Sequence, residues 1–244
     1  MQNELLTVTI LYDNRGGGAG LTTGWGFSAL VELGGTTVLF DTGADNLILS
    51  RNMEELDVDP QAIEAVVLSH PHCDHTGGLS AVLKENSDLT VYAPEDFPSS
   101  VKRSVNAYGA NYQPVSSPIE LEEGKGAISS TGPVKTNHKG QEMSEEGLVV
   151  ESQRGPVLIT GCAHPGIVKM VEAAEKLVED RIHLVVGGFH MGEMKEAQIK
   201  DIVEELKEKV EWVCPCHCTG EKGIEGFKQG FDNKFIPGEV GKVL

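Results

Sequence analysis

The sequence has few basic residues and no long apolar run, and both shortages exclude classes of protein. Lysine and arginine total 20 against 37 aspartates and glutamates, so the formal net charge is −17. This charge repels phosphate backbones and anionic lipid surfaces, which argues against nucleic acid or a membrane as a partner. No run reaches the roughly 18 apolar residues that a membrane-spanning helix needs. We therefore expect a small-molecule substrate. This substrate could be an anion if a local cationic pocket binds it. The sequence does not predict the oligomeric state.

Cysteine is also scarce, and its number is odd. The five cysteines, three of them within Cys214–Cys218, do not form the even set of a secreted disulfide framework. The first residues, Met1–Glu4, lack the basic start of a secretory signal, so we expect reduced thiols and a cytoplasmic location. Hydrophobic residues make up 39% of the 244 residues. This content predicts one domain spanning 1–244, with an irregular elaboration around 94–133 where prolines are scattered.

Three of the eight histidines lie within six residues, directly after the apolar run Ala65–Leu68. The metal-ligating types in this segment are His70, His72, Asp74 and His75. Imidazole and carboxylate are ligands of zinc, and the apolar run predicts a buried strand that delivers them. Because side chains alternate along an extended chain, His70, His72 and Asp74 are expected to point the same way. His75 would reach the same cavity from the turn at Gly77-Gly78, so the segment predicts a metal site.

Four further predicted strands end in polar or thiol side chains. The strand Thr36–Phe40, joined to Gly26–Leu33 by a hairpin turn at Gly34-Gly35, ends in Asp41. The other three ends carry Cys162 with His164, His190, and His217. If the chain stays extended, Cys162 and His164 face the same side. Enzymes of the α/β class assemble their sites from strand ends, so we expect these residues at one sheet edge.

Asp41 admits two readings. It is either a plain turn residue or the carboxylate that orients a ligand histidine through the second ring nitrogen. The strand that it ends precedes a metal motif, which favours the orienting role.

These residues resemble those of a known family. His70-x-His72-x-Asp74-His75, preceded by Leu39–Gly43, resembles the metallo-β-lactamase superfamily of hydrolases. Three further motifs resemble the subgroup that includes the archaeal dihydropterin-methyl-aminobenzene-phosphate synthase and related metal-dependent hydrolases: Gly161–His164, Gly187–His190 and Cys216–Gly220. The resemblance covers the chain from about Leu5 onward. It implies a mixed α/β (α+β) fold, a four-layer αββα sandwich with metal between the sheet edges.

The resemblance also implies a ligand set. One metal would be held by His70, His72 and His164, and a second by Asp74, His75 and His217. Hydrolytic members commonly bridge two metals with an aspartate, where this chain offers Cys162 or His164, so the number of ions stays open at one or two. A histidine at position 72 favours zinc, with manganese or another divalent ion as the alternative.

Each of the remaining histidines and cysteines has its own expected place. His138 is predicted to be a surface loop residue, and His183 and Cys214 core residues. Cys73 is expected to be structural, and Cys216 and Cys218 to pack beside His217 or form a separate thiolate metal site. His190 is either a core histidine or a catalytic group, and its strand end together with the resemblance favours catalysis.

Three functions remain. The first is a metal-dependent hydrolase of an ester, phosphoester or related small molecule, in which Asp74 accepts a proton from water and His190 stabilises an oxyanion or protonates the leaving group. The second is a transferase that condenses a dihydropterin-methyl diphosphate with an aminobenzene ribose phosphate. The third is a non-catalytic metal-binding protein.

Overall fold

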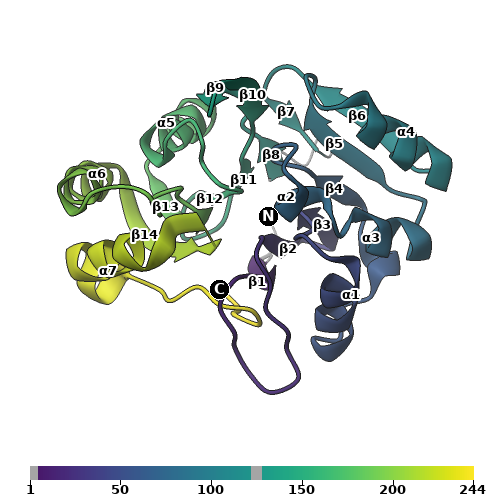
Figure 1. The fold of residues 1–244 in the computed structure, drawn as a ribbon, viewed down its shortest axis with the longest axis horizontal. Coiled ribbons are helices and arrows are strands. Elements are labelled where there is room, and N and C mark those ends of the chain that lie inside the picture. Colours follow the sequence, from purple (N-terminus) through teal and green to yellow (C-terminus); the bar gives the residue numbers. More distant parts are fainter. Residues whose placement is uncertain (1–4, 122–127) are drawn as a thin grey trace. The chain divides into compact units, whose positions relative to one another are not determined.

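The computed structural model describes residues 5–121 and 128–244. The chain divides into two compact units, Met1–Ser116 with Glu239–Leu244, and Ser117–Gly238. Each unit has its own six-stranded sheet and its own buried core (Figure 1). The predicted single domain stays a prediction.

The first unit is built on a sheet with the strand order β1-β2-β3-β4-β5-β6. Its strands are β1 Thr7–Tyr12, β2 Ser28–Leu33, β3 Thr36–Phe40, β4 Ala65–Val67, β5 Thr90–Pro94 and β6 Asn111–Val115. The predicted hairpin is confirmed, because β2 pairs antiparallel with β3 and Leu33 lies opposite Thr36. From β3 to β6 all pairs are parallel. Parallel neighbours end at the same sheet edge, so the residues that follow β3 and β4 come together.

Helices α1 (Asn46–Glu55), α3 (Leu79–Glu85) and α4 (Ser99–Tyr108) pack their apolar side chains into one core with this sheet. The core includes Leu39, Val66, Leu49, Val82 and Val105. α1 begins after Asp45, whose carboxylate accepts hydrogen bonds from two backbone N–H groups of the first turn. Such a cap satisfies donors that have no partner within the helix. The short segments η1 (Pro60–Ala62) and α2 (Cys73–Thr76) complete the helical part of this unit.

The segment Glu239–Leu244 belongs to the first unit because it pairs with β1. The N–H of Ile10 donates to the Lys242 carbonyl at 2.9 Å, and the N–H of Gly241 donates to the Ile10 carbonyl at 2.8 Å. Val240 is fully buried. The chain therefore returns to the first unit after building the second.

The second unit is built on a sheet with the order β14-β13-β12-β11-β8-β7, plus the hairpin β9-β10. Its strands are β7 Ile119–Glu120, β8 Ile128–Ser130, β9 Val134–His138, β10 Gln141–Glu145, β11 Leu148–Val150, β12 Val157–Thr160, β13 Ile182–Gly188 and β14 Val210–Cys216. β11 pairs antiparallel with β12, with Leu148 opposite Ile159. β12, β13 and β14 pair parallel, so the residues that follow them also meet at one sheet edge.

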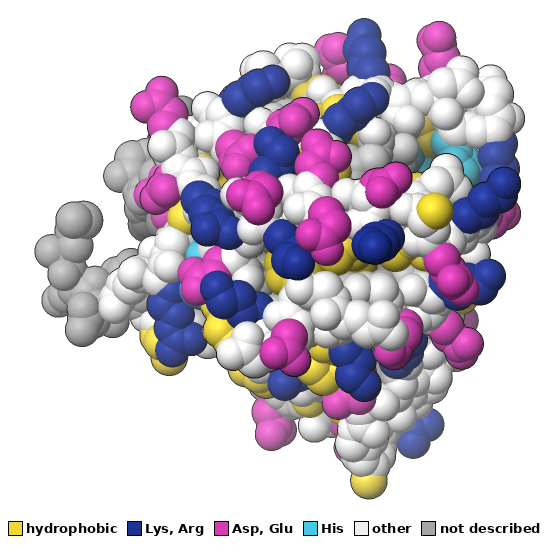
Figure 2. Space-filling view, turned by 90° about the vertical axis from the view of Figure 1, so that its left-hand side faces the viewer, with side chains coloured by type: hydrophobic (Ala, Val, Ile, Leu, Met, Phe, Trp, Pro, Cys, Tyr) yellow, Lys and Arg dark blue, Asp and Glu magenta, His cyan; other side chains and the backbone are white. Residues whose placement is uncertain are grey.

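Helices α5 (Ile167–Val178), α6 (Glu196–Lys209) and α7 (Gly220–Phe231) pack on this sheet, and α6 and α7 lie side by side (Figure 1). The short segments η2 (His217–Thr219) and η3 (Asp232–Lys234) precede and follow α7. α5 buries residues at positions i, i+3, i+4 and i+7, namely Ile167, Met170, Val171 and Ala174. This spacing makes one apolar stripe along the helix. Figure 2 shows basic and acidic side chains mixed over the face of the molecule that it views.

Two further expectations can be compared with the structure. The segment 94–133 is more regular than expected, because α4, β6, β7 and β8 lie largely or wholly within it; residues 122–127 lie outside the described part of the chain. In the described residues no helix combines the length and apolar character needed to span a membrane.

Candidate metal centre

The predicted site residues of the first unit follow the parallel strands β3 and β4. Asp41 comes directly after β3, and its N–H donates to the Val67 carbonyl of β4 at 2.8 Å. Ser69 and His70 follow β4, and all three of Asp41, Ser69 and His70 are fully buried. The sheet thus brings a buried carboxylate beside the first histidine of the motif.

Asp41 is the centre of a buried hydrogen-bond network. Its Oδ1 accepts from the Ser69 N–H at 2.7 Å and its Oδ2 from the Ser69 hydroxyl at 2.7 Å. The same Oδ2 lies 2.6 Å from Nδ1 of His75, and the Ser69 Oγ lies 2.8 Å from Nδ1 of His70. Burial raises the pKa of Asp41, and the charge and hydrogen bond of His75 offset part of that rise.

The network assigns the tautomers of both histidines. Ser69 has one hydroxyl proton, which it gives to Asp41, so its oxygen accepts a proton from Nδ1–H of His70. His75 likewise donates its Nδ1–H to the Asp41 carboxylate. Each ring then carries its lone pair on Nε2, the form in which a histidine binds a metal. The orienting role predicted for Asp41 requires a contact between its carboxylate and the second ring nitrogen of a histidine, and the network contains this contact.

The motif does not stay extended as expected. The helix α2 begins at Cys73, so Asp74 and His75 lie on a helical turn and the predicted alternation of His70, His72 and Asp74 is wrong at its third member. The ring of His70 nevertheless lies 4.8 Å from that of His72 and 4.1 Å from that of His75, measured between centroids. Nε2 of His75 lies 3.8 Å from the Asp74 carboxylate.

The helical turn is held against the loop that follows β3. Thr42 donates from its N–H and its hydroxyl to the His75 carbonyl, at 2.8 and 2.9 Å. A Cβ atom on Gly78 would lie 2.0 Å from the Thr42 carbonyl oxygen. Glycine at this position therefore permits the close approach that brings α2 to Asp41.

In the second unit, the predicted residues follow β12, β13 and β14. Cys162 and His164 come after β12, His190 after β13 and His217 after β14. The expectation of a single sheet edge is wrong, because Asp41 and the His70 motif belong to the sheet of the first unit and these four residues to that of the second. Each sheet edge thus has its own group of donor side chains.

The strand ends share a strained backbone conformation. Asp41, Ala163, His190 and His217 have φ values of 54°, 57°, 49° and 41°. Non-glycine residues in this left-handed region cost roughly 1–3 kcal/mol each and concentrate at functional sites. Each lies within three residues of the end of β3, β12, β13 or β14, where the predicted site residues are found.

A buried carboxylate also organises the loop after β12. Glu145 ends β10, is fully buried, and accepts hydrogen bonds from the N–H groups of Cys162, Ala163 and His164 at 2.7–2.8 Å. Its Oε2 lies 2.8 Å from Nδ1 of His164. Burial alone would raise the pKa of Glu145, but its bonds and charge interaction with His164 lower it below the ordinary value. Sequence reasoning missed Glu145.

His138 was predicted to be a surface loop residue, and this is wrong. It ends the strand β9 and is half-buried. Its ring centroid lies 4.5 Å from that of His164 and 5.0 Å from that of His190, which are 4.4 Å apart. The ligand atoms of these three histidines lie within 4.8 Å of one another. The second unit therefore holds a histidine cluster that the sequence motif alone did not define.

Cys218 and His190 alter each other's protonation. Burial raises the pKa of the Cys218 thiol, but hydrogen bonds with Cys162 and His190 and the charge of His217 hold it well below its usual range. The hydrogen bond with Cys218 in turn raises the pKa of His190 against the effect of burial.

The other predicted residues have mixed outcomes. Cys214 is fully buried, as expected for a core residue, whereas Cys73 is exposed and does not pack in the core. His183 is only partly buried and lies 3.1 Å from the Glu211 carboxylate, so it is not a core histidine. Cys216 is fully buried, with its Sγ 3.2 Å from the Cys214 carbonyl oxygen.

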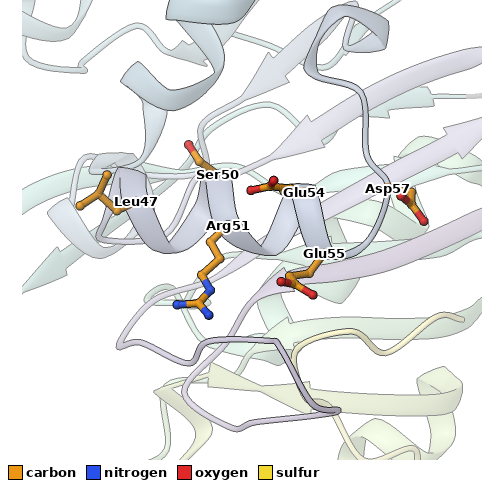
Figure 3. A pocket seen from close by; sticks show the side chains of 6 residues that line it. All are labelled: Leu47, Ser50, Arg51, Glu54, Glu55 and Asp57. Carbon is orange, nitrogen blue, oxygen red and sulfur yellow. The ribbon is translucent and has the colours of Figure 1, made fainter.

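A pocket elsewhere on the first unit shares no residue with the motif. Figure 3 shows its lining, which comes from α1 and the residue two positions beyond it: Leu47, Ser50, Arg51, Glu54, Glu55 and Asp57. It contains no histidine or cysteine, so it is not a candidate for the metal centre.

Comparison with known proteins gives one family for most of the chain. Residues 22–217 match the metallo-beta-lactamase superfamily. The 7,8-dihydropterin-6-methyl-4-(beta-D-ribofuranosyl)-aminobenzene-5'-phosphate synthase of Methanocaldococcus jannaschii is 28% identical, over 90% of this chain and 89% of its own. An uncharacterized protein of the same organism is 29% identical, over 90% of this chain and 92% of its own.

A solved structure extends the similarity to the fold. Tm1679, described as a metal-dependent hydrolase of the beta-lactamase superfamily, matches with a TM-score of 0.80 at 28% identity and covers 98% of both chains. The predicted resemblance and the predicted fold class, a mixed α/β fold of this superfamily, are both confirmed.

Proposed function

Because the chain belongs to the metallo-β-lactamase superfamily, we propose that it is a metal-dependent hydrolase of a small-molecule ester, phosphoester or related substrate. The observation that carries this proposal is the Asp41 network, which sets His70 and His75 in the tautomer that binds a metal. A turn residue without a functional partner would not need to be buried with three hydrogen bonds to a histidine motif.

The donor chemistry in each unit fits a divalent ion, as the superfamily implies. In the first unit, ligand atoms of Asp41, His70 and His75 lie within 4.8 Å of one another. In the second, the Glu145 carboxylate contacts Nδ1 of His164 at 2.8 Å, which leaves Nε2 of that ring for a metal. We propose as ligands His70, His72, Asp74 and His75 in the first unit, and His164 and His217 in the second. Zinc suits this set of imidazole and carboxylate, and manganese is the alternative.

A bound divalent ion supplies Lewis acidity, which acidifies water and polarises a carbonyl or phosphoryl oxygen of the substrate. Asp74, whose side chain is 17% exposed, reaches solvent and is the proposed acceptor of the proton from the attacking water. His190 is the proposed acid, because its hydrogen bond with Cys218 raises its pKa and favours the protonated ring. Asp41 holds the ring of His75 in place throughout.

The test is His72→Ala, with His183→Ala as the matched control because His183 contacts Glu211 and none of the proposed ligands. We expect His72→Ala to lose bound metal, measured by metal analysis after gel filtration, and to lose activity on phosphodiester, lactone and thioester probes. His183→Ala should keep both. A His72→Ala protein that keeps full activity without metal would contradict the proposal.

One observation favours a second candidate function. The Methanocaldococcus jannaschii relative, 28% identical over 90% of this chain, is named a synthase of a dihydropterin-methyl-aminobenzene compound. The second proposal is therefore a transferase that condenses a dihydropterin-methyl diphosphate with an aminobenzene ribose phosphate at the same residues. Incubation of the purified protein with both substrates distinguishes the two, because the condensation product appears only with a transferase. The third reading, a metal-binding protein without catalysis, is favoured only if neither assay gives product.

A further inference from the structure

A cavity of about 620 Å³ lies in the second unit between the start of β9 and one face of α5. Figure 1 shows β9 beside α5 in this unit. The volume falls within the roughly 300–1,000 Å³ of pockets that bind small molecules. None of the described residues that line the cavity is a proposed metal ligand. Its lining is therefore distinct from that of the candidate metal centre.

Two lysines and a small residue share one face of α5. Lys169 and Lys176 are seven residues apart, which is two helical turns or roughly 10.5 Å along the axis. Ala173 follows the first by four residues and precedes the second by three, so it lies on the same face. Both lysines are exposed, and the methyl group of Ala173 leaves a hollow between their long side chains. The helix therefore contributes an apolar floor with a positive charge at each end.

The start of β9 borders the cavity with a third lysine and with apolar side chains. Lys135 is exposed and lines the same cavity as the two lysines of α5. A Cβ atom on Gly132, which has a φ of 71°, would lie 2.6 Å from the Pro118 nitrogen. Glycine at this position therefore lets the chain approach Pro118, which forms part of the wall. The other apolar lining residues are Pro133, Val134, Ala173 and Leu177.

The charge of this lining is opposite to that of the whole protein. In a chain with a net charge of −17, the described lining holds three lysines and one acidic residue, Glu172. Glu172 lies 3.5 Å from Nζ of Lys209 on α6, which is not a lining residue. None of the three cavity lysines forms an ion pair with a residue that the structure describes. Three positive charges thus surround an apolar hollow whose one carboxylate is already paired.

A second cavity of the same unit provides the contrast. It has a volume of about 690 Å³, lies between α6 and α7, and is bordered by Lys200 and Lys222. Four glutamates share that lining: Glu196, Glu204, Glu221 and Glu225. The two cavities are therefore similar in volume but opposite in charge. An anion is attracted to the cavity beside β9 and repelled by the one beside α7.

We propose that the cavity between β9 and α5 binds a small organic anion, a phosphate or carboxylate that carries an apolar body. The three lysines bind the anionic group, because an ammonium on a flexible stem can turn towards a charge. The apolar lining residues take the body of the ligand, whose removal from water adds to the affinity. The acidity of the rest of the chain disfavours nucleic acid as the occupant. This inference goes beyond the proposed function and does not depend on it.

The test is isothermal titration calorimetry of the full-length protein at low salt with phenylphosphonate, benzoate and inorganic phosphate. Phenylphosphonate has no ester bond, so the proposed hydrolase activity does not consume it. We expect phenylphosphonate or benzoate to bind at least tenfold more tightly than inorganic phosphate, which has no apolar body. The tighter of the two identifies the anionic group that the site prefers. Binding should weaken as salt is added, because exposed charges are screened.

Variants locate the bound anion. Lys169→Met with Lys176→Met keeps the aliphatic stems and removes two charges, so we expect binding about fivefold weaker or more. Lys200→Met with Lys222→Met is the matched control, because these lysines border the other cavity, and it should bind as the wild type does. Ala173→Leu keeps every charge but fills the hollow, and should weaken binding at least tenfold. Leucine is a good helix former, so α5 should be retained, which circular dichroism checks.

His72→Ala separates this cavity from the proposed metal centre. It removes a proposed metal ligand and should leave the binding of phenylphosphonate or benzoate unchanged, whereas its loss would place the anion at the metal and overturn the site. The site would also be overturned by a wild type that binds neither organic anion, or that binds inorganic phosphate as tightly. Wild-type affinity in the Lys169/Lys176 or Ala173 variant, or equal weakening in the control, would overturn it too. If the site fails while activity still depends on His72, only this inference fails and the hydrolase proposal stands.

Discussion

Two buried carboxylates, Asp41 and Glu145, hold histidine rings by the same device in the two units. Each lies close to Nδ1 of a histidine, at 2.6 Å from His75 and 2.8 Å from His164, and each also accepts backbone N–H groups of the adjoining loop. The backbone bonds fix the loop, and the bond to Nδ1 fixes the tautomer and orientation of the ring. The two carboxylates are therefore expected to govern how well the histidines bind metal.

Asp41→Asn tests this in the first unit. The amide keeps the size of the side chain but loses the charge that Nδ1 of His75 contacts, so we expect metal affinity to fall about 10–100-fold. Competition with a chromophoric chelator measures the affinity. Asp45→Asn is the matched control, because Asn caps a helix as well as Asp does and α1 should begin unchanged. Equal affinity in both variants would contradict the orienting role.

Glu145→Gln tests the corresponding carboxylate of the second unit, and its effect is measured on the free energy of unfolding. The carboxylate accepts three backbone N–H groups and lies beside His164, and an amide cannot replace all of these contacts. We expect the free energy of unfolding of the metal-free protein to fall by about 3 kcal/mol or more, measured by urea denaturation at pH 7. Glu142→Gln, an exposed site on the same strand β10, should change it by less than about 0.5 kcal/mol. Similar losses of unfolding free energy in both variants would contradict the organising role of Glu145.

Which residues the sequence could predict depends on how local their signal is. The motif of the first unit is recognisable from the sequence because four potential metal ligands fall within six residues: His70, His72, Asp74 and His75. Glu145 and His138 carry no such signal, since each is a common polar residue in a short polar strand and gains its role only when β9 and β10 bring it to the loop after β12. Long-range pairing of this kind is not encoded in spacing.

At the scale of elements, hydrophobic pattern and glycine turns predicted the strands and hairpins well. β3 ends at Phe40 as predicted, because its buried apolar run stops where a polar residue begins. The early start of α2 at Cys73 was not predicted, since its cause lies in the Thr42 bonds to the His75 carbonyl rather than in helix-forming sequence. Tertiary contact overrides local preference there.

The close approach of α2 to the loop after β3 predicts the effect of Gly78→Ala. A Cβ atom 2.0 Å from the Thr42 carbonyl oxygen forces one backbone segment to move, so we expect a loss of about 2–4 kcal/mol in the free energy of unfolding. Gly18→Ala is the control, because nothing lies within 4 Å of a Cβ there, and it should be neutral or stabilising by up to about 1 kcal/mol. Chemical denaturation measures both, and a neutral Gly78→Ala would refute the argument.

The end of α6 is tied to α5 by charge, which predicts a pH dependence. Nζ of Lys209 lies 3.5 Å from Glu172 and 3.4 Å from Glu175. Burial lowers the pKa of Lys209, but the two carboxylates raise it above its ordinary value of 10.5. A raised pKa in the folded state means that the stabilisation is present in full below pH 10.5 and is lost as the pH rises further.

Lys209→Met keeps the aliphatic stem and removes the charge. We expect it to cost about 0.5 kcal/mol at pH 7 and low salt, with the difference from wild type fading in high salt and above pH 10.5. Urea denaturation at several pH values measures this. Lys200→Met, at an exposed position on the same helix, should show no such pH dependence. A difference that grows with rising pH would have the wrong sign and would refute the assignment.

At the scale of the molecule, the chain builds the first unit, then the second, and returns to the first through Glu239–Leu244. Sequence pattern could not predict this return, because the segment is short and β1, with which it pairs, lies more than two hundred residues earlier. The consequence is that the first unit is complete only when the last residues of the chain are in place. Its stability should then depend on a segment that carries no predicted site residue.

Removing Glu239–Leu244 should therefore destabilise the first unit selectively. The deletion loses Val240, which is fully buried, and backbone hydrogen bonds to Val8 and Ile10. Together these contribute about 4 kcal/mol or more. Hydrogen exchange should accelerate in β1 and β2 while β13 and β14 stay protected, because the second unit keeps its own sheet and core. Val243→Ser, at a position that is 57% exposed, should leave exchange unchanged in both units. Equal acceleration in both units would show that they unfold as one, and would refute a selective role for the returning segment.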